Sequence, residues 1–169
     1  MNSNNHITVD QIKNDAEVIK KELVEWRHYL HAHPELSFKE ERTTHYIVNK
    51  LKSFGYTDIQ IGFGPLKTGV MVEIGSGRPC VMLRADIDAL PIQEQTGVEF
   101  CSQSKGVSHA CGHDAHITNL LGVAKLLKKY ENSIKGRVKL LFQPAEETRV
   151  KIYEKPLSGA GYVVRSGAI

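Results

Sequence analysis

The apolar residues in the first part of the chain follow the period of an α-helix. From residue 9 onward they recur at spacings of three and four, which places them on one helix face. Thr8 and Gln11 form a capping-box pattern at the start of this stretch, and Pro34 marks its end. The apolar face consists of Val9, Ile12, Ala16, Ile19, Leu23, Trp26 and Leu30. This pattern predicts a packing helix, or alternatively a short coiled coil, behind a flexible polar tail over residues 1–7.

Three more segments have helical character. Ser37 and Glu40 repeat the capping pattern and predict a helix that runs to about Phe54, with Gly55 as its C-cap. A third helix is predicted for "CGHDAHITNLLGVAKLLKKY" and a short fourth one for "SGAGYVVRSGAI". The third helix gathers on one face the residues Ile117, Leu120, Leu121, Ala124 and Leu127. That face is suited to packing on a sheet.

Strand patterns separate these helices. The segments "TDIQIG" and "GVMVEIG" alternate apolar and polar residues, as half-buried strands do. The apolar run from Cys80 to Leu83 predicts a buried strand, with Asp86 and Asp88 at its exit. A further strand is predicted in "GRVKLLFQPAEE", with a buried run over residues 138–142 and a break at Pro144. Helices that alternate with strands favour the α/β class.

Composition narrows the function classes. A length of 169 residues fits one domain, and the net charge of +3 is too small to indicate nucleic-acid binding. The N-terminus lacks the basic and apolar regions of a signal peptide, and no apolar run approaches the roughly 20 residues that span a bilayer. Three cysteines do not make a closed disulfide framework. We therefore expect a cytoplasmic protein that binds neither membranes nor nucleic acid.

Polar residues gather where sites form in open α/β sheets, beyond the carboxyl ends of strands and at the amino ends of the following helices. The three pairs are Asp86 and Asp88, Glu146 and Glu147, and Cys111 and His113. Thiolate, imidazole and carboxylate groups are good ligands for a divalent transition metal. The helix start favours the thiolate form of Cys111. One glutamate of the pair could bind metal while its neighbour accepts a proton, and the aspartates could orient ligands or hold a second ion.

Other interpretations of the same residues remain open. A structural zinc site would need four closed ligands, and a redox pair would need C-x-x-C, which is absent. A nucleophilic Cys-His pair is a further alternative, although the two side chains diverge at a helix start. Adjacent glutamates are commonly solvated surface groups. The histidines outside the pair could be capping, supporting or helix-end residues: His28, His31, His33, His109 and His116.

Four motifs together resemble the metal-dependent amidohydrolases of peptidase family M20, in the aminoacylase-like branch. The motifs are "WRHYLHAHPELSFKEERTTHYI", "RADIDALPI", "SHACGHDAH" and "LLFQPAEE", in the family's order over about residues 22–147. The resemblance implies an α/β fold with a mixed sheet flanked by helices, as in zinc-peptidase-like catalytic domains. It makes residues 8–169 the N-terminal part of such a domain, without the family's smaller dimerisation domain.

The resemblance also implies a role for each matching residue. Cys111, His113 and Glu147 resemble metal ligands, Glu146 the general base and Asp88 the residue that supports the metal cluster. The cofactor implied is a divalent ion, zinc or manganese, with cobalt or nickel as alternatives. Asp86 stands where many relatives outside this branch carry a metal-binding histidine.

The reaction implied is hydrolysis of the amide bond of N-acyl amino acids, short peptides or related conjugates. Longer relatives of this type are expected to be homo-oligomers. Because the family's further histidine ligands do not occur in residues 148–169, we expect impaired activity in this chain. The alternatives are an inactive relative that binds only metal or a partner chain, and a cysteine-nucleophile hydrolase.

Overall fold

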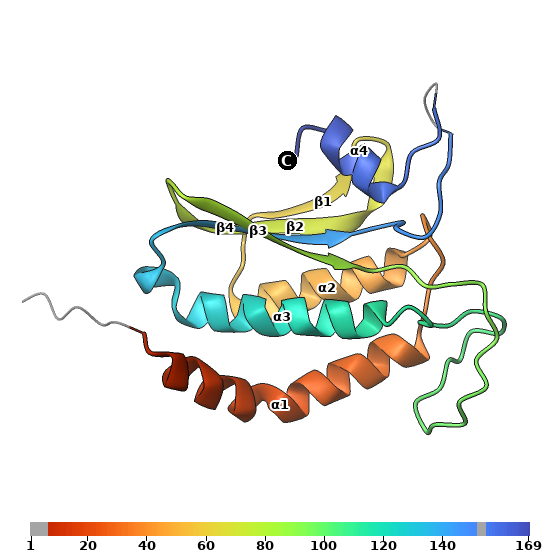
Figure 1. The fold of residues 1–169 in the computed structure, drawn as a ribbon, viewed down its shortest axis with the longest axis horizontal. Helices are drawn as coiled ribbons and strands as arrows, with labels where there is room; N and C mark the ends of the chain where they lie inside the picture. The colour runs from red at the N-terminus through yellow and green to blue at the C-terminus, as the bar shows by residue number, and fades with distance from the viewer. Residues whose placement is uncertain (1–6, 152–154) are drawn as a thin grey trace, which may run out of the picture.

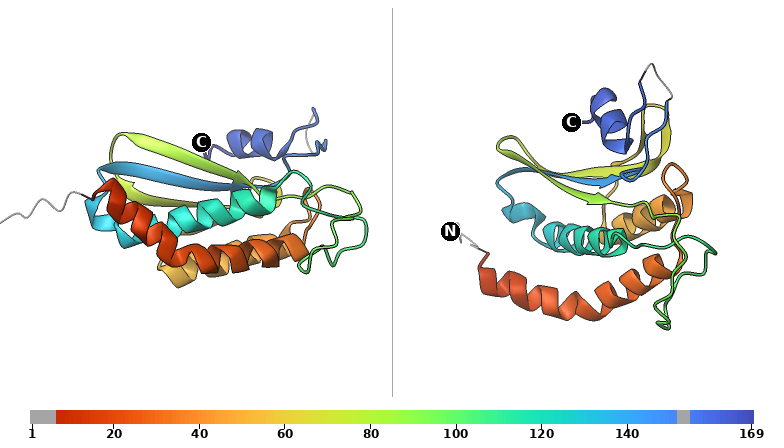
Figure 2. Two further views of the ribbon diagram at one scale, coloured as in Figure 1. Left: turned by 60° about the horizontal axis from the view of Figure 1, so that its bottom comes forward. Right: turned by 45° about the vertical axis from the view of Figure 1, so that its right-hand side comes forward.

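The computed structural model describes residues 7–151 and 155–169, so the predicted tail lies outside it except for Ile7. In chain order the elements are α1 (Val9–Ala32), α2 (Glu41–Phe54), β1 (Ile59–Phe63), β2 (Leu66–Ser76), β3 (Cys80–Asp86), α3 (His113–Lys129), the 3-10 turn η1 (Glu131–Ser133), β4 (Gly136–Gln143) and α4 (Gly159–Arg165). They stack in layers (Figures 1 and 2). The short helix α4 lies on one face of the sheet, α2 and α3 cover the other, and α1 packs outside α3.

The strands that the structure describes form one four-stranded sheet in the order β1-β2-β4-β3. The pairs β1-β2 and β2-β4 are antiparallel, whereas β3 and β4 are parallel and are connected through α3. The prediction of a mixed sheet flanked by helices is therefore confirmed. Since β3 and β4 run in the same direction, their carboxyl ends meet at one end of the sheet.

The alternation of side chains along β4 separates two apolar clusters. Leu140 and Phe142 face α2 and α3 in the main core, whereas Leu141 faces α4 and packs near Val163. The α3 residues that fill the main core include Ile117, Leu120, Leu121 and Ala124. The apolar face predicted for this helix is therefore the face that it buries.

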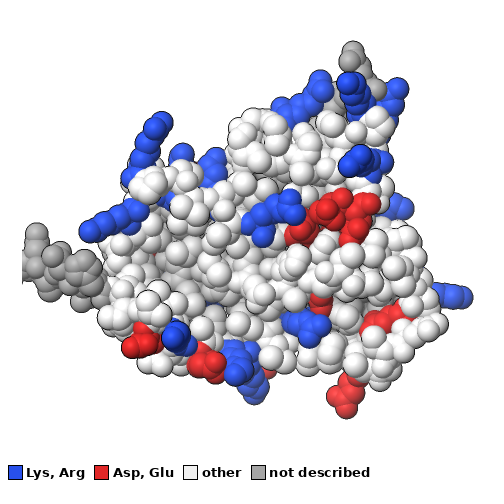
Figure 3. Space-filling model, viewed as in Figure 1, with Lys and Arg blue, Asp and Glu red and all other residues white. Residues whose placement is uncertain are grey.

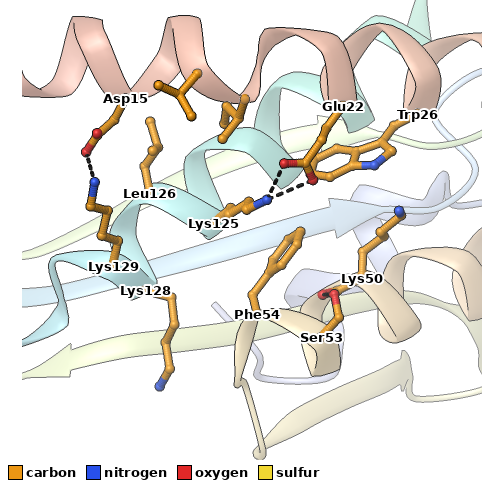
Figure 4. A pocket seen from close by; sticks show the side chains of 12 residues that line it. Asp15, Glu22, Trp26, Lys50, Ser53, Phe54, Lys125, Leu126, Lys128 and Lys129 are labelled. Carbon is orange, nitrogen blue, oxygen red and sulfur yellow. Dashed lines mark hydrogen bonds and ion pairs between the residues drawn. The ribbon is translucent and has the colours of Figure 1, made fainter.

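The long helix α1 packs against α3 along only part of its length. Its capping box is present, and the second half of its apolar stripe, with Trp26 and Leu30, is buried. Ion pairs join Glu22 to Lys125 at 2.6 Å and Asp15 to Lys129 at 2.5 Å (Figure 4). The start of the stripe stays exposed, with Val9 at 66% and Ile12 at 44% of full exposure, because α3 ends level with Asp15. The prediction of a packing helix holds for the later part of the stripe.

A cavity of about 450 Å³ opens between α1, α2 and α3, beside Trp26 and Lys125 (Figure 4). Lys50 lies over the Trp26 ring, with its Nζ 4.7 Å from the ring centroid. Lys125 follows His113 by about 18 Å along the helix axis, at about 1.5 Å per residue. This cavity is therefore remote from the amino end of α3.

The prediction that Ser37 caps the second helix was wrong. α2 begins at Glu41, and its N-cap residue Glu40 makes no side-chain capping bond. The carboxylate of Glu35 instead accepts hydrogen bonds from the backbone N–H groups of Arg42 and Thr43. A remote carboxylate can satisfy these free donors as well as a neighbouring side chain can. The C-cap prediction is confirmed, because Gly55 adopts the left-handed conformation with φ of 99°.

The run from Cys80 to Leu83 does form a strand, but the prediction that it is buried was wrong. Cys80 is exposed, and Val81, Met82 and Leu83 keep 52%, 41% and 38% of their full exposure. The physical reason is that β3 lies at the sheet edge in the described part of the chain, with β4 as its one neighbour. An apolar run predicts a strand, but it does not distinguish an edge strand from a central one.

Candidate metal centre

Two structural elements bring the three predicted ligands together. Glu147 follows β4, while Cys111 and His113 lie at the start of α3. One ligand atom from each of these three residues lies within 4.8 Å of the other two. On the face shown in Figure 3, acidic side chains gather over the end of the sheet where β4 finishes. The parallel strands and the helix start therefore converge as the sequence order predicts.

The ring of His113 is held in one orientation. Its Nδ1 lies 2.8 Å from the backbone carbonyl oxygen of Asp88. A carbonyl can only accept a hydrogen bond, so Nδ1 carries a proton, and in the neutral ring Nε2 keeps its lone pair. That Nε2 lies 3.8 Å from Oε1 of Glu147. His113 is thus prepared to bind a cation on the side of Glu147.

The buried residue Asp88 contacts His113 and Glu147 and so connects the two ends of the ligand group. Its side chain is fully buried, and its Oδ2 accepts hydrogen bonds from Ser37 Oγ at 2.6 Å and from the backbone N–H of Glu147 at 3.0 Å. Burial alone would raise the pKa of Asp88, but the hydrogen bonds from His113, Ser37 and the backbone lower it below its usual value. Asp88 therefore stays ionised, and it contacts both His113 and Glu147.

A strained turn at Ala145 directly precedes Glu146 and Glu147. Ala145, between Pro144 and Glu146, has a positive φ of 50°, which is uncommon for a residue with a Cβ. Its N–H donates to Oε1 of the buried Glu40 at 2.8 Å, and its carbonyl accepts from Gly159 N–H at 2.7 Å. These contacts hold the strained turn in place. Sequence reasoning assigned Glu40 to a helix cap and so missed this role.

The expectation that the helix start stabilises the thiolate of Cys111 was wrong for the metal-free protein. The hydrogen bond with Glu147, partial burial and the nearby negative charges raise the pKa of Cys111 to about 11. The three carboxylates that surround the thiol outweigh the partial charge of the helix end. A bound cation would reverse this balance, since it attracts both the thiolate and the carboxylates.

A second group of potential ligands shares His113. Asp86, His113 and His116 also place one ligand atom each within 4.8 Å of the others. Oδ2 of Asp86 contacts Nη2 of Arg84 at 3.0 Å and lies 3.8 Å from Nδ1 of His116. The two groups therefore lie next to each other and have His113 in common.

Two further residues singled out in the sequence, Glu146 and His109, lie outside both groups of potential ligands. Glu146 is exposed beside the ligand group, where its charge contributes to the raised pKa of Cys111. His109 is buried, and neither of its ring nitrogens has a hydrogen-bond partner among the described residues. Burial lowers the pKa of His109, so its ring is neutral.

The donor set fits a divalent transition metal. It combines one sulfur, one ring nitrogen and one carboxylate oxygen, a mixture that zinc accepts readily and hard ions such as Mg²⁺ do not. His113 has the supporting hydrogen bond typical of a metal-binding histidine. The donor types and their closeness, within 4.8 Å of one another, therefore fit such an ion.

Comparison with known proteins identifies the family. The model of peptidase family M20/M25/M40 matches residues 82–168, which include the whole ligand group. The chain belongs to peptidase family M20. An N-acyl-L-amino acid amidohydrolase of Geobacillus stearothermophilus is 45% identical over 143 residues, which are 83% of this chain and 38% of that protein. An N-acetyl-L-cysteine deacetylase of Bacillus subtilis is 52% identical over 131 residues, which are 76% of this chain and 31% of that protein.

A solved structure of the M20 family shares the fold. It is the Bacillus subtilis YXEP protein, described as a dinuclear metal binding peptidase from the M20 family. This M20 chain is 43% identical to it, with a TM-score of 0.75 over 90% of this chain and 40% of that one. The chain thus spans well under half the length of these M20 relatives. Within residues 7–151 and 155–169, no helix has the length and apolar character needed to cross a bilayer.

Metal binding to this M20 chain is expected to release a proton from Cys111. With a pKa of about 11 the thiol is protonated at neutral pH, and the ion must displace that proton. The apparent affinity should therefore rise about tenfold for each pH unit between pH 7 and 9. Zinc titration in weakly buffered solution with a pH indicator measures the protons released. The same titration of Cys111→Ala is the control, and equal proton release in both proteins would contradict the assignment.

Proposed function

We propose that this M20 chain carries three metal ligands of an enzyme that hydrolyses the amide bond of N-acyl amino acids or related conjugates. The observation that supports the proposal most directly is the convergence of Cys111, His113 and Glu147 within 4.8 Å. The ion is zinc or manganese, with cobalt and nickel as further candidates. When bound, it polarises the scissile carbonyl and lowers the pKa of water.

The general base of the proposed reaction is Glu146. Its exposed carboxylate lies next to the ligand group, so it can accept a proton from the attacking water. The water oxygen adds to the carbonyl carbon, the carbon–nitrogen bond breaks, and Glu146 passes the proton to the leaving amine. Asp88 and Ser37 take no part in these transfers. They hold His113 and Glu147 in the orientation that the reaction needs.

The substrate class follows from the relatives. The two curated relatives described above are named for the removal of an acyl group from the nitrogen of an amino acid. Small N-acyl amino acids and short peptides are therefore the proposed substrates of this chain as well. The site residues present here act on the amide group that all of these share.

Slow, chelator-sensitive release of free amino acid is the expected result when the purified chain is incubated with zinc or manganese, in keeping with the impaired activity that its sequence predicts. N-acetyl and N-benzoyl amino acids are suitable substrates. A chelator should abolish the release, and added metal should restore it, because the carbonyl then regains its polarising ion. Turnover that survives the chelator but is blocked by thiol alkylation would indicate a cysteine nucleophile instead. Metal binding without any turnover would favour the alternative, a chain that only binds metal.

A further inference from the structure

His31 lies between two buried carboxylates at the carboxyl end of α1. Its Nδ1 is 2.8 Å from Oδ2 of Asp114, and its Nε2 is 3.0 Å from Oε1 of Glu94. The side chains of Asp114 and Glu94 keep only 1% and 6% of their full exposure. Ionised carboxylates can only accept hydrogen bonds, so both ring nitrogens of His31 carry protons. The imidazole is therefore a cation that bridges two buried anions.

Asp114 belongs to the first turn of α3, directly after His113. Neighbouring residues of a helix point about 100° apart, so Asp114 faces α1 while His113 faces the strand ends. Arg27, one turn before His31 on the same face of α1, also contacts Asp114, with Nε 3.2 Å from Oδ2. Two basic side chains of α1 thus contact the same carboxylate oxygen in the first turn of α3.

Glu94 connects the same histidine to the loop between β3 and α3. Its Oε2 accepts a hydrogen bond from the Ser102 N–H at 2.5 Å, and its Oε1 is also contacted by the Thr96 hydroxyl. In this loop, the Phe100 ring meets His31 edge-on, with 5.5 Å between the ring centroids. In Figures 1 and 2 the loop lies beside the end of α1 and the start of α3. His31 is the group that these three segments share.

We propose that His31 is a positioning residue, which joins α1, the 94–102 loop and the first turn of α3 and so fixes Cys111 and His113 for metal binding. This inference rests on the proposed metal site. Without His31, Glu94 loses its cationic partner and Asp114 keeps only the half-exposed Arg27, so the two buried carboxylates are no longer bridged and Asp114 is expected to shift toward Arg27 and solvent. Movement of Asp114 would carry His113 with it. The ligand group would then lose the geometry that gives high affinity.

Cobalt binding to the purified chain tests the proposal without an activity measurement. Co²⁺ bound to the Cys111 thiolate gives a sulfur-to-cobalt charge-transfer absorption, and its titration gives the dissociation constant. His31→Ala is expected to weaken cobalt binding by about 10- to 100-fold, the range for loss of a group that orients ligands. His31→Gln, which can donate to one carboxylate, should recover part of the affinity. In metal-free His31→Ala, amide hydrogen exchange should rise over residues 111–116.

Two matched variants separate positioning from general stability. His33→Ala removes the neighbouring C-cap histidine of α1, whose Nδ1 contacts the Tyr29 carbonyl instead of the site. Tyr56→Phe removes a hydrogen bond to the Ala124 carbonyl in the middle of α3. Both should bind cobalt as the unchanged chain does, although Tyr56→Phe is less stable.

Three outcomes would overturn the proposal. Folded His31→Ala or His31→Gln that binds cobalt as tightly as the unchanged chain would show that the ligands need no such fixing. An equal loss of affinity in Tyr56→Phe would show that stability alone is responsible. A missing charge-transfer absorption in the unchanged chain would refute the metal site itself, and with it this role for His31.

Discussion

Glu146→Gln is expected to lower the rate of N-acyl amino acid hydrolysis by about 100- to 10,000-fold, the usual contribution of a general base. Glutamine keeps the shape of the side chain but cannot accept the proton from the attacking water. Metal binding should stay unchanged, because Glu146 lies outside the ligand group formed by Cys111, His113 and Glu147. The measurement is release of free amino acid per bound ion, with metal content determined on the same sample.

Two glutamate variants make this test specific. Glu147→Gln should lose activity together with metal, since it alters a ligand. Glu25→Gln, at an exposed position of α1, should alter neither. Glu146→Gln that retains the activity of the unchanged chain would rule out its role as the base. Glu146→Gln that loses metal would show that the two glutamates have the opposite roles.

Cys111→Ala is expected to weaken zinc binding by more than about 100-fold, because loss of an orienting partner alone costs up to that factor. The substitution removes the sulfur and leaves one nitrogen and one carboxylate oxygen, too few ligands for tight binding. Metal content after dialysis, together with a competition titration, gives the affinity.

Another cysteine, Cys101, supplies the control for this variant. Cys101 is exposed and lies outside both groups of potential ligands, so Cys101→Ala should bind zinc as the unchanged chain does. Equal zinc content in Cys111→Ala and in the unchanged chain would refute the assignment of Cys111. Loss of zinc in Cys101→Ala would place the site elsewhere.

The two expected results address different parts of one arrangement. Cys111 tests whether the start of α3 holds the ion, and Glu146 tests whether the turn after β4 supplies the base. Both depend on buried polar residues behind the site, since Asp88 orients His113 and Glu40 holds the strained turn at Ala145. Much of the precision of this site is therefore supplied by residues that do not contact the ion.

The sequence by itself determined the elements and the family of this protein. Helix and strand periods are local properties of a chain, so the capping box at Thr8, the C-cap at Gly55 and the apolar face of α3 could be predicted. The order of the motifs also predicted that the ends of β3 and β4 would meet the start of α3. The family comparison confirmed the resemblance that these motifs carried.

The tertiary structure alone decided what the polar residues contact. Ser37 lies 51 positions from Asp88, and His31 lies 83 positions from Asp114, so no local pattern reports either contact. The exposure of Val81 depends on how many strands flank β3, and the raised pKa of Cys111 depends on carboxylates from other segments. Periodicity encodes which face a side chain occupies. The neighbours on that face, and therefore its charge and burial, are set only when distant segments pack together.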